Sequence, residues 1–279
     1  MKVEKVINNN LIRTTINHKE ALVMGKGLGF KQNVGDLVDE SRIERVYLIN
    51  QKEKRSRLEE LLDRIPYNDV KVVNEIVDYA SQALQTPLDE SIWLGLIDHV
   101  HYAIERVKKG VIVKNALLWE ISRFYNREFL ISKEALKIVE KHQGVVLPED
   151  EAGFIALYLV NAQMEDSTRI QTTMQMTTIL RTILDIVKYH FGLTLNESSL
   201  HYDRFVTHLK YFIQRLHQRK FIQDDDLGFI DVIKQKYINE YACALKIERY
   251  IEGEFKTKLT ENEIVYLTIH MRRVIDESR

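Results

Sequence analysis

The chain has 279 residues, of which 45% are hydrophobic and 29% are charged, so it has the composition of a folded protein rather than a disordered one. Its single cysteine, Cys243, excludes an intrachain disulfide and is typical of a reducing compartment. The longest apolar run, residues 154–160, is far shorter than the roughly 20 residues that span a bilayer. We therefore expect a cytoplasmic protein without membrane insertion.

Charge is distributed unevenly along the chain. The first 57 residues contain 12 Lys and Arg against 7 Asp and Glu, whereas the other 222 contain 28 against 34. The net charge of −1 therefore conceals a basic N-terminal part on an acidic body. Chance can produce such a difference, but it is also typical of a protein that binds a polyanion at one end.

The N-terminal part is predicted to be a small β-sheet. Short runs rich in β-branched residues are separated by turn-forming asparagines and glycines, and they cover residues 3–7, 11–16, 21–24 and 45–49. Four strands in about 50 residues form a sheet with one apolar face and too little chain to cover it, so we expect dimerisation. The polar residues 50–57 are predicted to be a linker or the start of a helix.

From Leu58 onward, apolar residues recur at steps of three and four, which predicts helices. This helical part contains an internal repeat: the segment 99–106 recurs 109 residues later, and the segment 147–158 recurs 112 residues later. A duplicated unit of this kind predicts two similar domains in tandem. The expected fold is multidomain α+β, a small antiparallel β-sheet domain followed by two all-α helical bundles, with domains at residues 1–57, 58–168 and 169–279.

The nine histidines do not have the spacing of a metal or hydrolase site. On a helix, His99 and His101 are about 200° apart and face different ways. The i, i+4 histidine pair, the cysteine pair and the nucleophile-elbow motif are all missing from the sequence. Cys243 is interpreted as an inert core residue. We therefore expect no enzyme activity, no metal and no cofactor.

His99 and His208 occupy equivalent positions in the two copies. A buried histidine with a hydrogen-bond partner is the ordinary explanation, but its recurrence favours a function. A neutral imidazole can accept a phosphoryl group, and the product gains nearly two negative charges. Arg106 and Arg215 lie seven residues further on, about 10 Å along the helix, so we assign them no phosphate role.

The basic N-terminal part has residues suited to RNA. Lys5 supplies charge, and the amides of Asn8 and Asn10 can read base edges. The glycines of residues 25–27 allow close backbone approach, and Phe30 can stack on an unpaired base. The alternative is that Phe30 belongs to the core and that the asparagines only form turns.

These motifs together resemble the BglG/SacY/LicT family of transcriptional antiterminators. The segments 5–10, 23–30 and 35–36 are similar to the RNA-binding co-antiterminator domain of that family. The two repeated units resemble its PTS-regulation domains, through the segments 98–99, 115–120, 147–153, 204–209 and 267–270. The resemblance spans essentially the whole chain in the family's domain order.

The resemblance implies a mechanism. A dimer would bind an RNA hairpin in a nascent leader transcript and prevent a terminator from forming in a sugar-utilisation operon, commonly for β-glucosides or sucrose. The sugar phosphotransferase system would phosphorylate histidines, with the phosphocarrier HPr activating through the second regulatory domain and the sugar permease inhibiting through the first. The alternatives are a phosphoryl-carrier component of that system or a DNA-binding activator, although a β-rich head argues against a helix-turn-helix and we expect no DNA partner.

The resemblance also implies which residues bind RNA. They are Lys5, Asn8, Asn10, Gly25, Lys26, Gly27, Phe30 and Gln32. Relatives often have arginine at the position of Lys26. Lysine keeps the charge but lacks the planar fork of arginine, so we expect Lys26 to contact phosphate rather than read a base.

The phosphorylation positions implied by the resemblance are His99, His208 and His270. Tyr158 stands where relatives usually have a second histidine in the first regulatory domain, and the internal repeat aligns it with His270. We therefore predict that phosphate-dependent control of the first unit depends on His99 alone. His101 is expected to be structural, because its counterpart in the second unit is Lys210.

Overall fold

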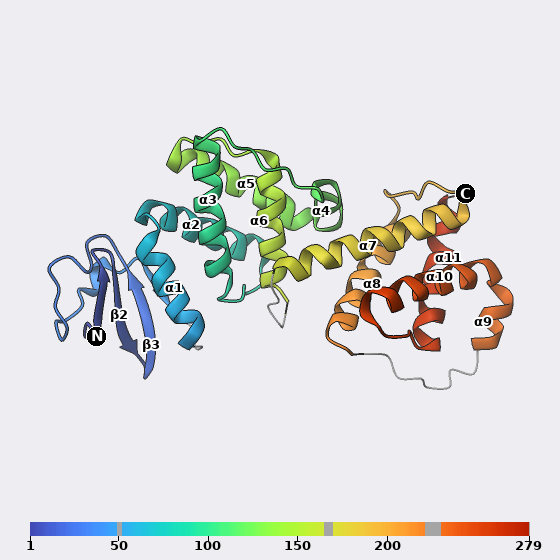
Figure 1. The fold of residues 1–279 in the computed structure, drawn as a ribbon, viewed down its shortest axis with the longest axis horizontal. Helices are drawn as coiled ribbons and strands as arrows, with labels where there is room; N and C mark the ends of the chain where they lie inside the picture. The colour runs from blue at the N-terminus through green and yellow to red at the C-terminus, as the bar shows by residue number, and fades with distance from the viewer. Residues whose placement is uncertain (49–51, 165–169, 221–229, 279) are drawn as a thin grey trace. The chain divides into compact units, whose positions relative to one another are not determined.

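The computed structural model describes residues 1–48, 52–164, 170–220 and 230–278 (Figure 1). The chain forms two compact units, Met1–Thr173 and Met174–Arg279, which are described separately below. Within the described residues, no helix has both the length and the apolar character needed to cross a membrane. The expected domain boundary between residues 168 and 169 lies outside the described residues.

The first unit begins with an antiparallel four-stranded sheet in the order β1-β2-β3-β4. The strands are β1 (Lys5–Asn8), β2 (Leu11–Ile16), β3 (Lys19–Met24) and β4 (Arg45–Tyr47). Asn17 and His18 connect β2 to β3 with positive φ values of 49° and 63°, the backbone geometry that a two-residue hairpin of type I′ requires. The predicted strands are confirmed to within about two residues; Ile49, at the end of the last prediction, lies outside the described residues.

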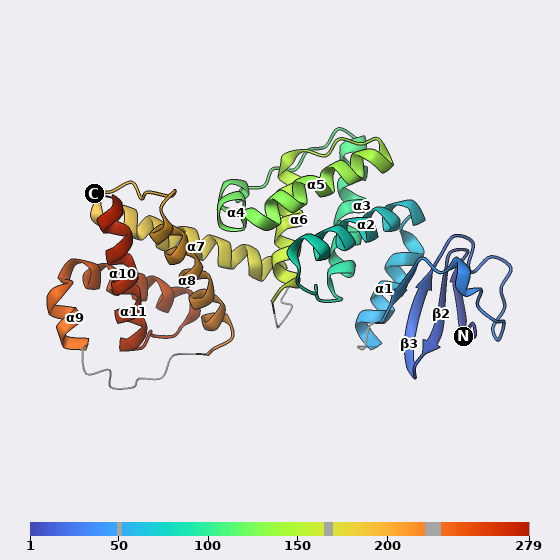
Figure 2. The same cartoon turned by 180° about the vertical axis from the view of Figure 1, so that it is seen from behind.

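Both faces of this sheet are covered by the same chain, unlike the uncovered face expected from the sequence. On one face, the buried apolar residues form a small core of Val3, Ile12, Ala21, Val23, Leu28 and Val38. On the other, Leu11, Leu22 and Tyr47 join the core of the helices that follow. Figure 2 shows α1 (Lys52–Arg64) lying between the sheet and the remaining helices of the first unit. The expectation of an uncovered face is wrong because it considered only the first 57 residues, and the apolar side chains of α1 that cover the sheet begin at Leu58.

A polar cluster also joins the sheet to these helices. The hydroxyl of Tyr47 donates to Asn74 Oδ1 at 3.0 Å, and the indole Nε1 of Trp93 donates to the same oxygen at 3.1 Å. Arg45 lies over the Trp93 ring, 4.8 Å from its centroid, and forms an ion pair with Asp78 at 2.6 Å. The head and the first helical module therefore form one compact unit, and the expected boundary after residue 57 falls inside α1.

The helices of the first module after α1 pack around a common apolar core. They are α2 (Tyr67–Leu84), α3 (Ile92–Lys108), α4 (Leu118–Phe124), α5 (Asn126–Gln143) and α6 (Glu149–Ala162). The predicted periodicity on α3 is confirmed, because Leu96, Val100 and Ala103 are fully buried.

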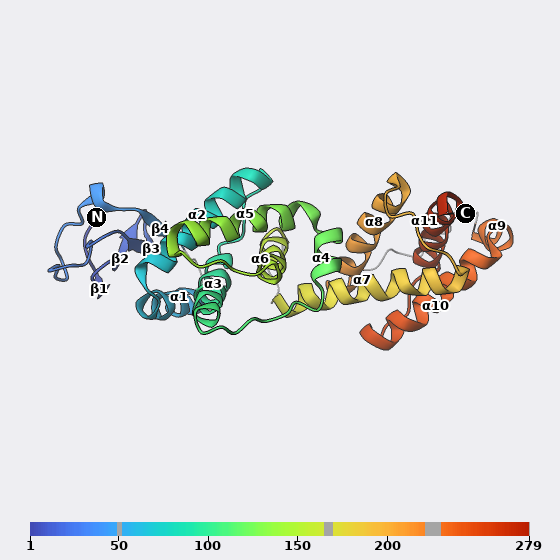
Figure 3. The same cartoon turned by 90° about the horizontal axis from the view of Figure 1, so that it is seen from above.

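The second unit repeats this helix order. Its helices are α7 (Ile170–Phe191), whose first residues belong to the first unit, α8 (Leu200–His217), α9 (Ile230–Lys236), α10 (Ile238–Phe255) and α11 (Glu261–Ser278). Figure 3 shows α8, α10 and α11 beside α7. The sequence repeat pairs α3 with α8, α5 with α10 and α6 with α11, so equivalent histidines lie on equivalent helices.

Candidate RNA interface and phosphorylation sites

The loop after β3 is held in one conformation by residues outside it. The backbone N–H of Gly27, a residue with a φ of +64°, donates to Asn10 Oδ1 at 2.8 Å. Arg42 Nη2 donates to the Lys26 carbonyl at 2.9 Å. At Gly25, a Cβ atom would lie 1.9 Å from the Arg42 carbonyl oxygen, so only glycine fits. Sequence reasoning selected this loop but missed Arg42, because nothing in its local pattern indicates the contact.

This loop presents an aromatic ring and a charge to solvent. Phe30 is 54% exposed, which contradicts the alternative that it belongs to the core. Lys26 is exposed and Gln32 is half-buried. An exposed large aromatic side chain on a loop of fixed conformation suits base stacking.

Two other candidate RNA residues contact α1. Lys5 Nζ forms an ion pair with Glu59, whose other oxygen lies 3.5 Å from Arg13 Nη1. Asn8 Nδ2 donates to the Leu62 carbonyl at 3.3 Å, while its Oδ1 accepts from the Asn10 backbone at 2.9 Å. Asn8 therefore does serve the turn, as the alternative reading held, and its side chain is also engaged by α1.

In the first module, two residues of α3 contact the same carboxylate: His99 and, seven residues later, Arg106. His99 Nε2 lies 3.0 Å from Glu151 Oε2, and Arg106 Nη2 lies 2.9 Å from Glu151 Oε1. Burial alone would raise the pKa of Glu151, which is 1% exposed, but His99 and Arg106 lower it overall. Arg106 was assigned no phosphate role because of its distance from His99 along the helix, and Glu151 of α6 connects the two residues across that distance.

Tyr158 packs against His99 but cannot replace a histidine. Its ring centroid lies 5.4 Å from that of His99. Burial and the nearby Asp98 carboxylate raise the pKa of Tyr158 to about 12, so the phenol stays protonated at neutral pH. Gly95 of α3 makes room for this ring, because a Cβ atom at that position would clash with Tyr158 at 2.4 Å.

In the second module, two histidines and a tyrosine form a close cluster. The centroids of His208 and His270 are 4.0 Å apart, and Tyr266 Oη lies 2.6 Å from His208 Nδ1. Burial lowers the pKa of His270 to about 4, with added effects from His208 and Arg273. Burial, Arg204 and Arg273 also lower the pKa of His208. Both rings are therefore mainly neutral at pH 7 and retain a nucleophilic nitrogen.

Arg215 and Glu263, the counterparts of Arg106 and Glu151, carry buried polar atoms without a hydrogen-bond partner among the described residues. These atoms are Arg215 Nε and Nη2 and Glu263 Oε1. Buried polar atoms are nearly always paired, so an arginine in this state is prepared to meet an anion. Arg106 Nε and Glu151 Oε2 of the first module likewise lack a hydrogen-bond partner among the described residues, so the two modules differ at Nη2 of the arginine, which donates to Glu151 Oε1 at 2.9 Å in the first module only.

His101 and the lone cysteine fall outside these clusters. His101 Nδ1 lies 2.7 Å from Asp69 Oδ2, a contact between α3 and α2. Burial raises the pKa of the Cys243 thiol to about 12, so it is unreactive. Within the part of the chain that the structure describes, no group of three or more His, Cys, Asp or Glu side chains is placed to hold a metal.

Sequence comparisons assign both parts of the chain. The description "CAT RNA binding domain" matches residues 1–56, and "PRD domain" matches residues 74–162 and 181–274. The chain belongs to the BglG/LicT family of transcriptional antiterminators. It is an RNA-binding regulator of transcription rather than an enzyme, and its duplicated unit is the PRD domain.

Individual antiterminators of this family are similar over their full length. The chain is 47% identical to the transcription antiterminator LicT of Bacillus subtilis, covering 100% of both chains. It is 42% identical to the beta-glucoside operon antiterminator of Dickeya chrysanthemi, covering 99% of this chain and 98% of the relative. The crystal structure of GlcT CAT-PRDI superposes with a TM-score of 0.52 and 30% identity, covering 59% of this chain and 98% of that one. The expected α+β fold is thereby confirmed.

Proposed function

We propose that this antiterminator acts as a cytoplasmic dimer that binds an RNA hairpin in the leader transcript of a sugar-utilisation operon and prevents terminator formation. A β-glucoside operon is the favoured target, because the name of the 42% identical relative specifies one. The observation that carries the RNA-binding part is the rigid loop 25–30, with an exposed Phe30 at its end.

The loop supports a division of roles among the RNA-binding residues. Phe30 would stack on an unpaired base, and the exposed Lys26 would contact a phosphate. Asn10 Oδ1 is already used to hold Gly27, so the RNA would meet the Nδ2 group of Asn10. Lys5 and Asn8 would join this surface once their contacts with α1 are exchanged for RNA.

Phosphorylation of the second module by HPr would activate the antiterminator. The neutral His208 and His270 each offer a nitrogen to a phosphoryl donor, and Arg215 has buried N–H groups that a phosphate would satisfy. With centroids only 4.0 Å apart, two dianionic phosphates on these rings would repel strongly, so one phosphate per cluster is favoured.

Phosphorylation of His99 in the first module by the sugar permease would inhibit the antiterminator. A phosphate on His99 would face the buried carboxylate of Glu151, which now lies 3.0 Å from the ring. Repulsion between these anions would break the contact and release Arg106 to pair with the phosphate. The new arrangement of α3 against α6 would then change the equilibrium between active and inactive dimers.

The test of this function is RNA binding by head variants. A labelled leader hairpin with internal loops would be titrated with the full chain and with Phe30→Ala. Loss of one stacked base should weaken binding by about 5- to 150-fold. Val34→Ala is the matched control, because Val34 is also exposed, at 73%, in the same head. Equal affinity of the wild type and Phe30→Ala would overturn the proposed RNA surface.

A further inference from the structure

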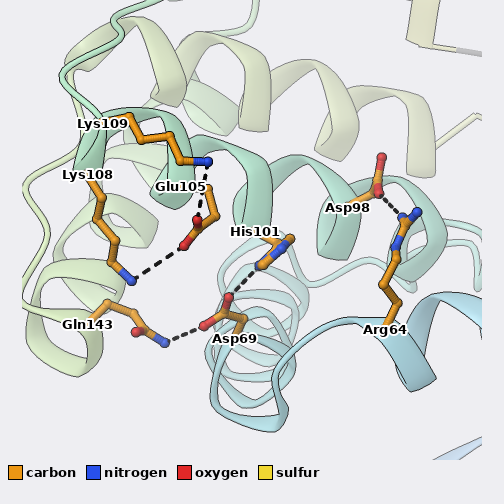
Figure 4. A network of polar contacts seen from close by, with 8 residues as sticks. All are labelled: Arg64, Asp69, Asp98, His101, Glu105, Lys108, Lys109 and Gln143. Atoms are coloured by element: carbon orange, nitrogen blue, oxygen red, sulfur yellow. Dashed lines mark hydrogen bonds and ion pairs between the residues drawn. The ribbon is translucent and has the colours of Figure 1, made fainter.

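Asp69, His101 and Gln143 form a polar cluster that joins three helices of the first module (Figure 4). His101 Nδ1 lies 2.7 Å from Asp69 Oδ2, and Gln143 Nε2 donates to Asp69 Oδ1 at 2.8 Å. Asp69 is only 6% exposed, whereas the His101 side chain is 18% exposed. A buried carboxylate is thus fixed against one ring nitrogen of a histidine that solvent can still reach.

This contact determines which nitrogen of His101 is nucleophilic. A carboxylate can only accept, so in the neutral ring Nδ1 carries the proton and Nε2 has the lone pair. Among the residues that the structure describes, the hydrogen-bond partner of His101 is Asp69, at Nδ1. At His208, Nδ1 contacts the hydroxyl of Tyr266, which can donate or accept, so that contact does not select one nitrogen. At His99, by contrast, Nε2 faces the buried carboxylate of Glu151.

Cations also lie near His101, each paired with a carboxylate at the surface. In Figure 4, the amines of Lys108 and Lys109 and the guanidinium of Arg64 lie along the same side of α3 as His101. Lys108 and Lys109 each pair with Glu105 at 3.8 Å, and both are well exposed, so these weak ion pairs can open at little cost. Arg64 pairs with Asp98 at 3.2 Å, also at the surface.

We propose that His101, which the sequence analysis expected to be structural, is a second phosphorylation site of the first module, so that control of this module does not depend on His99 alone. The Nε2 lone pair attacks the phosphorus of a phosphorylated donor protein, a P–N bond forms, and the bond between phosphorus and the donor side chain breaks with its electron pair going to the donor. The Nδ1 proton stays on His101, where Asp69 stabilises the positive charge that develops on the ring. This inference rests on the proposed function, which supplies the donor proteins.

The site is specific to the first module. The counterpart of His101 is Lys210, so the repeat does not reproduce it. A phosphate at His101 would add nearly two negative charges beside Asp69, Asp98 and Glu105. Such repulsion would loosen the contact of α3 with α2, the helix that also holds Tyr47 of the head through Asn74.

The test is phosphate mapping on the full chain. The triple variant His99→Asn, His208→Asn, His270→Asn would be incubated separately with phosphorylated HPr and with the phosphorylated permease. Peptides would be mapped by mass spectrometry at a pH that preserves phosphohistidine. We expect phosphate on His101, and we expect Asp69→Asn, which keeps a hydrogen-bond acceptor but loses the charge, to slow its appearance on the order of tenfold. The wild-type chain would be mapped in parallel.

The outcomes separate this inference from the proposed function. Phosphate at His208 or His270 of the wild type, with none at His101 of either protein from either donor, would overturn the His101 site and leave the proposed regulation intact. No phosphate at any histidine of the wild type would overturn the proposed regulation as well. An unchanged rate in Asp69→Asn, with melting curves that show a folded variant, would overturn the role of the carboxylate.

Discussion

His208 and His270 lie with ring centroids 4.0 Å apart, whereas the equivalent pair in the first module is His99 and Tyr158, with centroids 5.4 Å apart. The two modules therefore place equivalent rings beside one another, at different separations and with different chemistry. Imidazole accepts a phosphoryl group at neutral pH, but the Tyr158 phenol, with a pKa raised to about 12, does not.

This difference predicts that Tyr158→His gives the first module a new phosphoryl acceptor. The imidazole would occupy the position that His270 has in the second module, beside a ring that is already there. Mass spectrometry after incubation with the phosphorylated permease should find phosphate at residue 158 of this variant. Tyr158→Phe, which keeps the ring but not the hydroxyl, should show the same phosphorylation of His99 as the wild type; phosphate on the wild-type tyrosine would contradict the prediction.

The low pKa of His270 predicts that acid destabilises the second module. Its folded value of about 4 lies below its ordinary value of 6.5, so the unfolded chain binds more protons between these pH values. The unfolding free energy of the second module is therefore highest, as far as His270 is concerned, above pH 6.5, and it decreases as the pH falls toward 4. Allowing for partial exposure, we expect a loss of about 2 kcal/mol. Chemical unfolding at several pH values would measure it, and His270→Gln should remove this part of the pH dependence.

The contacts of α1 with the sheet predict that Glu59→Gln strengthens RNA binding. In the wild type, Glu59 holds Lys5 and Arg13, and the RNA must compete for these cations. Removing a partly exposed carboxylate should raise affinity by about two- to fivefold, since such pairs contribute less than about 1 kcal/mol. Glu60→Gln, one residue further on the same helix and exposed, is the control for the change in net charge. Equal effects of the two variants would mean that the gain is a general charge effect.

The buried position of Glu151 predicts a large cost for its neutralisation. Glu151→Gln would leave Arg106 and His99 without their shared anion, and we expect a loss of about 2 kcal/mol in the unfolding free energy of the first unit. Glu149→Gln removes an ion pair with Lys133 at the surface and should cost less than about 0.5 kcal/mol. Thermal melts of the wild type and the two variants would measure both losses of unfolding free energy. A similar small effect at both positions would show that the buried pair contributes little.

Local sequence patterns determined a large part of this protein. Alternating β-branched runs and asparagine turns predicted the strands of the head, and the stripe through Leu96 and Ala103 predicted α3. The repeat placed His99 and His208 at equivalent positions and identified Tyr158 as the counterpart of His270. These features follow from short-range periodicity and from duplication, which are properties of the chain that do not depend on its packing.

Only the tertiary structure decided how these residues are combined. Glu151 brings Arg106 to His99, and Asp69 fixes the ring of His101, although each carboxylate comes from a helix distant in the sequence. The covering of the sheet through Tyr47 and Asn74 is likewise a contact between elements that no local pattern marks. The physical reason is that periodicity specifies which face of an element is buried, whereas the partner on that face is selected by the packing of the whole unit.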